Sequence, residues 1–290
     1  MILVTGAGGT VGAEAVRQLA ARGHRTRALL KDPARLGTVP PGVEAFAGDL
    51  MDRYAVNEAL KGVDRIVLAG ETGPDHVAAH SNVIQAARRR GLKMVVKVSA
   101  FGADAQSPIN LARWNAQSED ELRRADVPHA ILQPQLFMQS TLGWAREVRE
   151  EGVFRGALRD GAVALVDARD VAAVAVAILL GRGHEGKTYA VTGGEALTGR
   201  DVAAELSDAL GRPIRYVDIP APELKRRVAE AGAPPWLADD VAALHVFLGT
   251  GGGASTTRVV RDLTGAPPRT FRAFARELAD AFGSSASTRS

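Results

Sequence analysis

The first residues of the chain carry glycines at a spacing that suits the binding of a diphosphate. Gly6, Gly9 and Gly12 follow an apolar run, Ile2 to Val4, and lead into residues with helical apolar spacing. In a strand–turn–helix unit, the first glycine permits a tight turn, the second lets a pyrophosphate approach the backbone, and the third lets the helix pack on the strand. The helix N-terminus then offers free N–H groups to the phosphates. The alternative is a glycine turn without a ligand. The place of the glycines between a strand and a helix favours dinucleotide binding.

The end of the second expected strand bears on which dinucleotide is bound. Lys31 and Arg35 are four residues apart, with Pro33 at a plausible first helical position, so both can face one 2′-phosphate. Asp32 leaves two alternatives open, since a carboxylate here can neutralise Lys31 or accept hydrogen bonds from the 2′-OH of NAD. A third alternative is that these are solvated surface charges. The pattern favours NADP(H) over NAD(H).

Strands and helices alternate along the first half of the chain. The expected strands after the first are Arg25–Lys31, Val43–Ala47, Asp64–Ala69, Met94–Ser99 and His129–Gln133. The expected helices include Tyr54–Leu60, Pro74–Arg90 and Leu111–Ala125. Such alternation predicts an α/β fold with a doubly wound parallel sheet.

Ligands of such sheets bind beyond the carboxyl ends of the strands. Functional residues are therefore expected in the segments Gly6–Val11, Lys31–Arg35, Asp49–Leu50, Ala69–Glu71, Ser99–Phe101 and Pro134–Met138.

The second half of the chain is expected to build a substrate pocket. Further strands are predicted at Val153–Phe154, Val163–Val166, Lys187–Val191 and Ile214–Val217. Helices are predicted at Gly143–Glu151, Asp170–Leu180, Leu197–Leu210, Ala221–Ala231, Pro235–Phe247 and Phe271–Phe282, with a flexible joint at Gly249–Gly253. Asp167 and Asp170 resemble a carboxylate pair, but Asp170 is interpreted as a helix N-cap. Large apolar side chains expected around the pocket are Trp114, Phe137, Met138, Trp144, Trp236 and Phe247.

Composition limits the function classes. Among 290 residues, 46% are hydrophobic and 24% charged, and the net charge is +3. The basic residues are interspersed with acidic ones, which disfavours a nucleic-acid surface, and no apolar run approaches the ~20 residues that span a bilayer. The absence of cysteine excludes thiolate chemistry and disulfides. His76 and His80 lack a third ligand, so no metal site is expected. A cytoplasmic protein is the default expectation.

Several segments together resemble the NmrA-like branch of the atypical short-chain dehydrogenase/reductase superfamily. The similarity extends to about residue 283 and is carried by Val4–Gly12, Arg27–Pro33, Gly48–Leu50, Ser118–Leu122, Ile131–Met138 and Leu165–Ala172. The resemblance implies an NAD(P)-binding Rossmann domain with a smaller, mostly C-terminal α/β substrate-binding part. The Rossmann domain is expected to comprise residues 1–134, with later strands from 160–218 contributing. The substrate-binding part is expected at 135–283, followed by a disordered tail at 284–290.

The resemblance also implies roles for individual residues. Lys31 and Arg35 would hold the 2′-phosphate, and Asp49 with Leu50 would lie beside the adenine, although Asp49 is also a candidate N-cap for a helix starting near Met51. The complete set of residues expected at the cofactor is Thr5, Gly6, Gly8, Gly9, Thr10, Val11, Gly12, Lys31, Arg35, Asp49, Leu50, Ala69, Gly70, Glu71, Ser99, Pro134 and Phe137.

The chain lacks the Tyr-x-x-x-Lys pair with which orthodox members of the superfamily protonate a carbonyl. The residues four positions after its three tyrosines are Glu58, Gly193 and Pro220. Asn115 stands where relatives often carry a histidine. Ser99 and Asn115 are the candidate catalytic residues, as hydrogen-bond donors to a developing oxyanion. The alternative is that Ser99 only ends a strand and Asn115 faces solvent.

Two functions remain open. The first is an NADPH-dependent oxidoreductase that transfers hydride to a small apolar acceptor such as a quinone, an activated enone or an iminium. The second is a non-catalytic NADP(H)-binding regulator that senses redox state through a protein partner. The sequence favours the oxidoreductase, acting as a monomer or homodimer on a small hydrophobic substrate, without nucleic acid or membrane.

Overall fold

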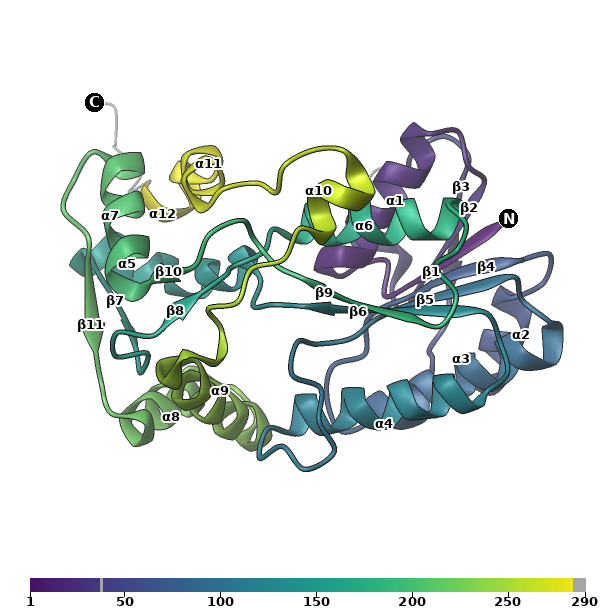
Figure 1. The fold of residues 1–290 in the computed structure, drawn as a ribbon, viewed down its shortest axis with the longest axis horizontal. Helices are drawn as coiled ribbons and strands as arrows, with labels where there is room; N and C mark the ends of the chain where they lie inside the picture. Colours follow the sequence, from purple (N-terminus) through teal and green to yellow (C-terminus); the bar gives the residue numbers. More distant parts are fainter. Residues whose placement is uncertain (37–38, 284–290) are drawn as a thin grey trace.

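A seven-stranded parallel sheet forms the centre of the molecule (Figure 1). The computed structural model describes residues 1–36 and 39–283, and the predicted disordered tail, 284–290, lies outside them. The strands, in spatial order, are β3 (Val43–Ala47), β2 (Thr26–Leu30), β1 (Ile2–Thr5), β4 (Arg65–Leu68), β5 (Met94–Val98), β6 (His129–Pro134) and β9 (Lys187–Val191). The order reverses direction between β1 and β4, which is where such sheets bind ligands.

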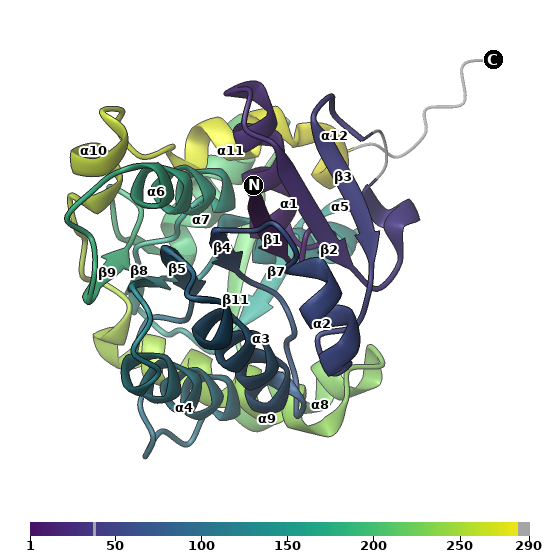
Figure 2. The same ribbon diagram turned by 90° about the vertical axis from the view of Figure 1, so that its right-hand side faces the viewer.

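Helices cover both faces of this sheet (Figures 1 and 2). One face carries α1 (Thr10–Ala21), α6 (Ala168–Leu180) and α10 (Val259–Thr264), and the other carries α2 (Arg53–Ala59), α3 (His76–Arg90) and α4 (Asn110–Arg124). The central strands β1, β4, β5 and β6 are mostly apolar because both of their faces are buried, whereas the edge strands β3 and β9 are partly exposed. The predicted doubly wound α/β fold is confirmed.

The later part of the chain is divided between this sheet and a smaller α/β region. Helix α6 and strand β9 return to the large sheet, and the prediction of two domains divided at residue 134 stays a prediction. The smaller region contains two-stranded pairs, β7 (Val153–Gly156) with β11 (Arg215–Asp218) and β8 (Ala162–Val163) with β10 (Leu197–Thr198). Its helices are α5 (Ala145–Glu151), α7 (Gly199–Leu210), α8 (Ala221–Glu230), α9 (Pro235–Phe247), α11 (Phe271–Glu277) and α12 (Ala279–Gly283).

Several predicted boundaries differ from the observed ones. The strand expected at Val163–Val166 ends at Val163, and the helix expected at Phe271–Phe282 is broken near Leu278. A 3₁₀ segment, η2 (Met138–Trp144), precedes α5, and another, η1 (Pro33–Leu36), follows β2. The segment predicted as a flexible joint, Gly249–Gly253, coincides largely with a π turn, η3 (Leu248–Gly252), that is kinked at Gly251, and its flexibility stays a prediction; α10 was not predicted.

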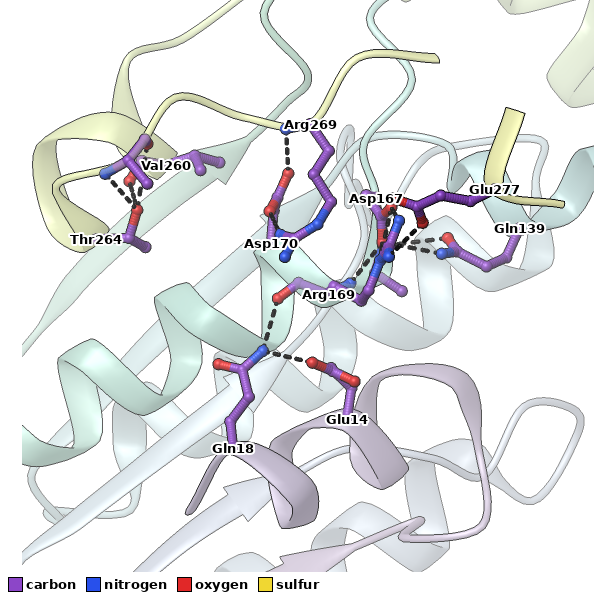
Figure 3. Close-up of polar contacts among 12 residues, drawn as sticks. Glu14, Gln18, Gln139, Asp167, Arg169, Asp170, Val260, Thr264, Arg269 and Glu277 are labelled. Atoms are coloured by element: carbon purple, nitrogen blue, oxygen red, sulfur yellow. Dashed lines mark hydrogen bonds and ion pairs between the residues drawn. The ribbon is translucent and has the colours of Figure 1, made fainter. Parts of the chain in front are cut away.

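The start of α6 shows how a long-range contact decides between two capping candidates (Figure 3). Asp167, and not Asp170, is the N-cap: its carboxylate accepts a hydrogen bond from the backbone N–H of Arg169 at 2.8 Å. The prediction for Asp170 was wrong because that side chain is paired with Arg269, whose backbone N–H also donates to it. Arg169 neutralises Asp167 at 2.6 Å and reaches Glu277.

Helix α9 holds the N-terminus of α4 through one buried carboxylate. Asp240 is 2% exposed and accepts hydrogen bonds from the backbone N–H groups of Asn110 and Leu111 and from the Asn110 amide, at 2.8–2.9 Å. Next to it, the rings of Trp114 and Trp236 meet edge to face at 5.3 Å. A residue of the smaller region thus performs the capping that α4 lacks from its own N-cap.

Asp240→Asn is expected to destabilise the protein by about 1–3 kcal/mol, because the new amide turns N–H groups toward the N–H groups it should cap. Urea unfolding measures the loss. Asp239→Asn is the matched control, since the neighbouring carboxylate is half exposed and its ion pair with Lys225 lies at the surface. Equal stability of the two variants would contradict the capping role.

No helix of the described residues is both long and apolar enough to cross a bilayer.

Candidate functional site: a cleft at the β1–β4 junction

The backbones that follow β1 and β4 touch at the point where the strand order reverses. Gly6 (φ 58°) and Gly70 (φ 88°) both have left-handed conformations, and a Cβ on either would lie 2.7 Å from the Cα of the other. Only glycine fits such an approach. Beneath them, the Thr5 hydroxyl donates to the carbonyl of Ala69 at 2.6 Å and accepts from its N–H at 3.0 Å, which fastens the two strand ends together.

The turn between β1 and α1 offers an unobstructed helix N-terminus. Gly9 is exposed and is the N-cap of α1, with no side chain over the first turn. A Cβ at Gly9 would meet only the Gly6 carbonyl, at 3.2 Å, whereas a Cβ at Gly12 would overlap the same carbonyl group severely. Gly12 therefore serves packing and Gly9 keeps the approach to the free N–H groups open. These features fit the diphosphate of a dinucleotide.

A cleft of about 290 Å³ opens at this turn. It is lined by Gly6, Gly9, Thr10, Val11, Gly12, Ala69, Gly70, Thr72, His76, Val98, Ser99, Leu111, Asn115 and Phe137. Ten of these were predicted site residues, and Thr72, His76, Val98 and Leu111 were not. His76 and Leu111 lie near helix starts, and no local pattern indicates that these helix ends border the cleft.

Three charged residues form a separate cluster at the carboxyl ends of β2, β3 and β4. The Lys31 ammonium lies 3.3 Å from a carboxylate oxygen of Asp49 and 3.3 Å from one of Glu71. The hydrogen bond that the ammonium donates to Glu71, and then the one to Asp49, raise the pKa of Lys31. Glu71 itself has φ 50°, an unfavourable conformation for a residue with a side chain. Asp32 instead accepts from the N–H of Ala34, and the side chain of Arg35 lies outside the described residues.

The remaining predicted cofactor residues support this surface from below or beside it. Leu50 is 5% exposed and belongs to the core under α2 and α3, and Pro134 is buried at the end of β6. Asp49 accepts from the N–H of Met51 at 2.9 Å but does not cap the helix, because α2 begins at Arg53 with Asp52 as its N-cap. The N-cap alternative for Asp49 was wrong by one turn.

The Ser99 hydroxyl uses its proton in a hydrogen bond within the protein. It donates a short hydrogen bond to the Glu119 carboxylate, a side chain on α4 that is 2% exposed and is also bound by Arg123 and Gln133. Ser99 lines the cleft, but its proton is engaged by Glu119. Its oxygen therefore faces a ligand only as an acceptor.

Asn115 does not face solvent, so that alternative was wrong. It lies on α4, is 6% exposed and lines the cleft. Its amide oxygen accepts from the Lys97 ammonium at 2.8 Å, and its amide nitrogen donates to the Leu111 carbonyl at 3.0 Å. Lys97 is a lysine inside the otherwise apolar strand β5, and this break in the pattern was the signal that the sequence analysis missed.

The buried rings of His76 and His80 pack against each other, tilted by 34°, with centroids 4.0 Å apart. Their ring nitrogens bond to the backbone carbonyls of Glu71 and Gly70, at 2.7 and 3.0 Å. Burial, followed by the charge of Lys97, lowers the pKa of His76 to about 4 and that of His80 well below its ordinary value. Both imidazoles are thus neutral, and each uses one nitrogen to hold the loop after β4.

The aromatic side chains expected around the pocket separate into different environments. Phe137 lines the cleft, and Trp114 and Trp236 pair beside the loop that contains Gly73. Trp144 is stacked on Phe154 at 4.4 Å. Met138 is buried in the same core as Trp144, and Phe247 is 40% exposed on the surface.

The fold and the cleft together fit a dinucleotide-binding protein of the Rossmann type. Residues 6–181 match the family described as NAD(P)H-binding. Over 284 residues, 98% of this chain and 99% of the relative, it is 39% identical to an NAD(P)H azoreductase from Xenophilus azovorans. It is 40% identical to a (4-alkanoyl-5-oxo-2,5-dihydrofuran-3-yl)methyl phosphate reductase from Streptomyces griseus, covering 97% of this chain and 99% of the relative.

A solved structure of the same kind is the NADPH-dependent quinone oxidoreductase of Escherichia coli in complex with NADPH. It superposes with a TM-score of 0.88 at 29% identity, covering 96% of this chain and 100% of that one. The chain belongs to the NAD(P)H-binding family and is an NAD(P)H-dependent oxidoreductase, which confirms the predicted enzyme class and the predicted NAD(P)-binding Rossmann fold.

Gly9→Val is expected to abolish binding of the nicotinamide cofactor while the protein stays folded, because the branched side chain occupies the approach to the α1 N-terminus. Gly12→Ala should instead unfold or destabilise the protein through its overlap with Gly6. Circular dichroism and cofactor fluorescence titration separate the two effects. A folded Gly9→Val variant that binds cofactor normally would remove the glycine turn from the site.

Proposed function

We propose that the chain reduces a small apolar acceptor, a quinone, an activated enone or an iminium, with NADPH as the preferred reductant. The observation that carries this proposal is the cleft beside the glycine turn, which places Phe137, Leu111 and Asn115 next to the same space as Gly9. The relatives named above act on azo, quinone and butenolide compounds, all of which accept hydride at a conjugated system.

The residues of the cleft would act mainly by holding and desolvating the acceptor. The bound NADPH supplies the hydride. Val98 and Phe137 supply apolar contacts for a flat acceptor, and Asn115 is proposed as the hydrogen-bond donor to the oxygen on which charge develops. Ser99 is assigned a role as acceptor toward the cofactor, because its proton is held by Glu119.

None of the three tyrosines lies among the residues that line the cleft. Tyr54 is 74% exposed on α2, and Tyr189 shares a hydrogen bond with His184 at 2.8 Å. Tyr216 donates to Asp218 and accepts from the N–H of Leu158. The absence of a tyrosine acid from the sequence pattern thus agrees with their positions.

We favour this reaction over the alternative of a non-catalytic redox sensor, because the relatives that match over the whole chain are named as reductases. We also propose the division near residue 134 into a cofactor-binding and a substrate-binding part, in which Asp240 of α9 caps α4 and α4 contributes Leu111 and Asn115 to the cleft. A cytoplasmic monomer or homodimer remains the proposed form.

Incubation with NADPH and a panel of quinones, enones and iminium dyes should consume nicotinamide absorbance. Phenylalanine variants of Tyr54, Tyr189 and Tyr216 should turn over within about twofold of the unsubstituted protein, since none is placed to deliver a proton. A large loss in one tyrosine variant would show that the proton donor lies elsewhere than proposed. Absence of turnover with every acceptor would favour the sensor.

Cofactor preference is expected to depend on a balance between cations and carboxylates. Lys31 and Arg35 favour a 2′-phosphate, so NADPH should bind about tenfold tighter than NADH, and alanine at both positions should erase the difference.

Glu71 forms an ion pair with Lys31, so Glu71→Gln should increase the preference for NADPH by freeing the ammonium. Glu44→Gln is the control, because that carboxylate pairs with Arg27 on β2. Isothermal titration with both cofactors measures the effect, and equal affinities in the unsubstituted protein would end the proposal.

A further inference from the structure

Lys97 is a completely buried lysine in the middle of the large sheet. Its side chain has 0% exposure and projects from β5 to the face covered by α3 and α4, one residue before the strand ends at the cleft. The ammonium makes one good hydrogen bond, to Asn115 at 2.8 Å, and a long one to the Val98 carbonyl at 3.4 Å. A buried ammonium with so few partners is costly, and nothing in the packing of the sheet requires it.

Charged and titratable groups approach Lys97 from every neighbouring element. Burial lowers the pKa of Lys97, and on α4 the charge of Glu119 raises it whereas that of Arg123 lowers it further. The charge of Lys97 in turn adds to burial in lowering the pKa values of His76 and His80 on α3. Gln133 on β6 and Ser99 on β5 are bound to Glu119. Glu119 is committed to Ser99, Arg123 and Gln133, so Lys97 has a hydrogen bond only to Asn115 among the described side chains.

The lysine determines how the Asn115 amide is turned. Because an ammonium only donates, the amide oxygen must face Lys97 and the amide nitrogen must face away from it. One N–H then goes to the Leu111 carbonyl, and the described residues provide no acceptor for the second. Asn115 lines the cleft, so this second N–H is available to a ligand there.

We propose that Lys97 is a positioning residue for the reduction, which fixes the Asn115 amide as a hydrogen-bond donor to the acceptor and places positive charge beneath it. The inference rests on the proposed function and adds what takes the place of the tyrosine–lysine pair: a lysine on a strand acting through an asparagine on a helix. Charge that develops on the acceptor oxygen is stabilised by both groups without transfer of a proton from either.

The position of Lys97 also makes the charge sensitive to pH. Burial lowers the pKa of Lys97 to about 7, against a favourable effect of Glu119. The lysine is therefore charged below about pH 7 and neutral above it, whereas the unfolded chain keeps the proton up to its ordinary pKa of about 10.5. Because the unfolded state binds more protons in this interval, the contribution of Lys97 to stability improves as pH rises through it.

The test compares single-turnover hydride transfer and NADPH affinity in five single variants and one double variant. Lys97→Met removes charge and donor, Lys97→Gln keeps a neutral donor, Asn115→Asp keeps the partner of Lys97 but loses the amide N–H, and Asn115→Ala removes both groups. Lys93→Met is the matched control, since that lysine precedes the same strand but is 70% exposed. The double variant Lys97→Met/Asn115→Ala shows whether one residue acts through the other.

The inference requires Asn115→Ala and Asn115→Asp to slow hydride transfer by about 10²–10³ and Lys97→Met by at least about tenfold, with NADPH affinity nearly unchanged. The double variant should be no slower than Asn115→Ala, and Lys97→Gln should recover part of the rate. The rate of the unsubstituted protein should fall as pH rises through 7, and this decline should be absent in Lys97→Met. An unaffected Lys97→Met variant, or losses that add in the double variant, would overturn the inference.

A readout without turnover separates this inference from the proposed function. The ¹⁵N resonance of the Asn115 side-chain amide should titrate near pH 7 in the unsubstituted protein and not in Lys97→Met. The stability of the unsubstituted protein should rise relative to Lys97→Met between pH 7 and 9. If no acceptor is reduced, the proposed function fails. An Asn115 resonance that does not titrate would overturn the positioning role in either case.

Discussion

The contact between the backbones of Gly6 and Gly70 is the constraint on which the site depends. It forces the ends of β1 and β4 together at the reversal of strand order, and the Thr5 hydroxyl locks that junction from the interior. With the two strand ends fixed, the N-terminus of α1 and the loop after β4 form adjoining walls of the cleft. A methyl group at either glycine would separate these walls, because the overlap is with backbone atoms that cannot rotate away.

The two sides of the site use electrostatics in different ways. At the rim of the site, Lys31 forms ion pairs with Asp49 and Glu71 at the protein surface. Water weakens these pairs, so a ligand phosphate can compete for the ammonium. Beneath the floor of the cleft, the side chains of Lys97 and Glu119 are buried, so each charge interacts strongly with its surroundings. The rim is therefore suited to selecting a cofactor and the floor to influencing what happens at its reactive end.

The sequence predicted those parts of the fold and site that local patterns determine. Gly6, Gly9 and Gly12 have a spacing that only a close turn explains, and the alternation of apolar segments specified the parallel sheet. The pairing of Lys97 with Asn115 was not predictable, because a strand residue and a helix residue meet only through tertiary packing. The choice of Asp167 over Asp170 as the cap of α6 depended on Arg269, which lies far away in sequence. The pairing of Lys31 with Glu71 was likewise not predictable, since Glu71 lies in the loop after β4, far from Lys31 in sequence.

Strand β9 and helices α6 and α10 return to the large sheet late in the chain. The order in which the chain is synthesised therefore affects how the large sheet folds. Val4 and Val16 share their hydrophobic core with Val174, Val191 and Val260. Strand β1 and helix α1 are thus translated well before the partners that complete their core, and such non-local contacts slow folding. Until those partners are synthesised, the apolar surface that β1 and α1 bury in the folded protein lacks its cover, which favours aggregation.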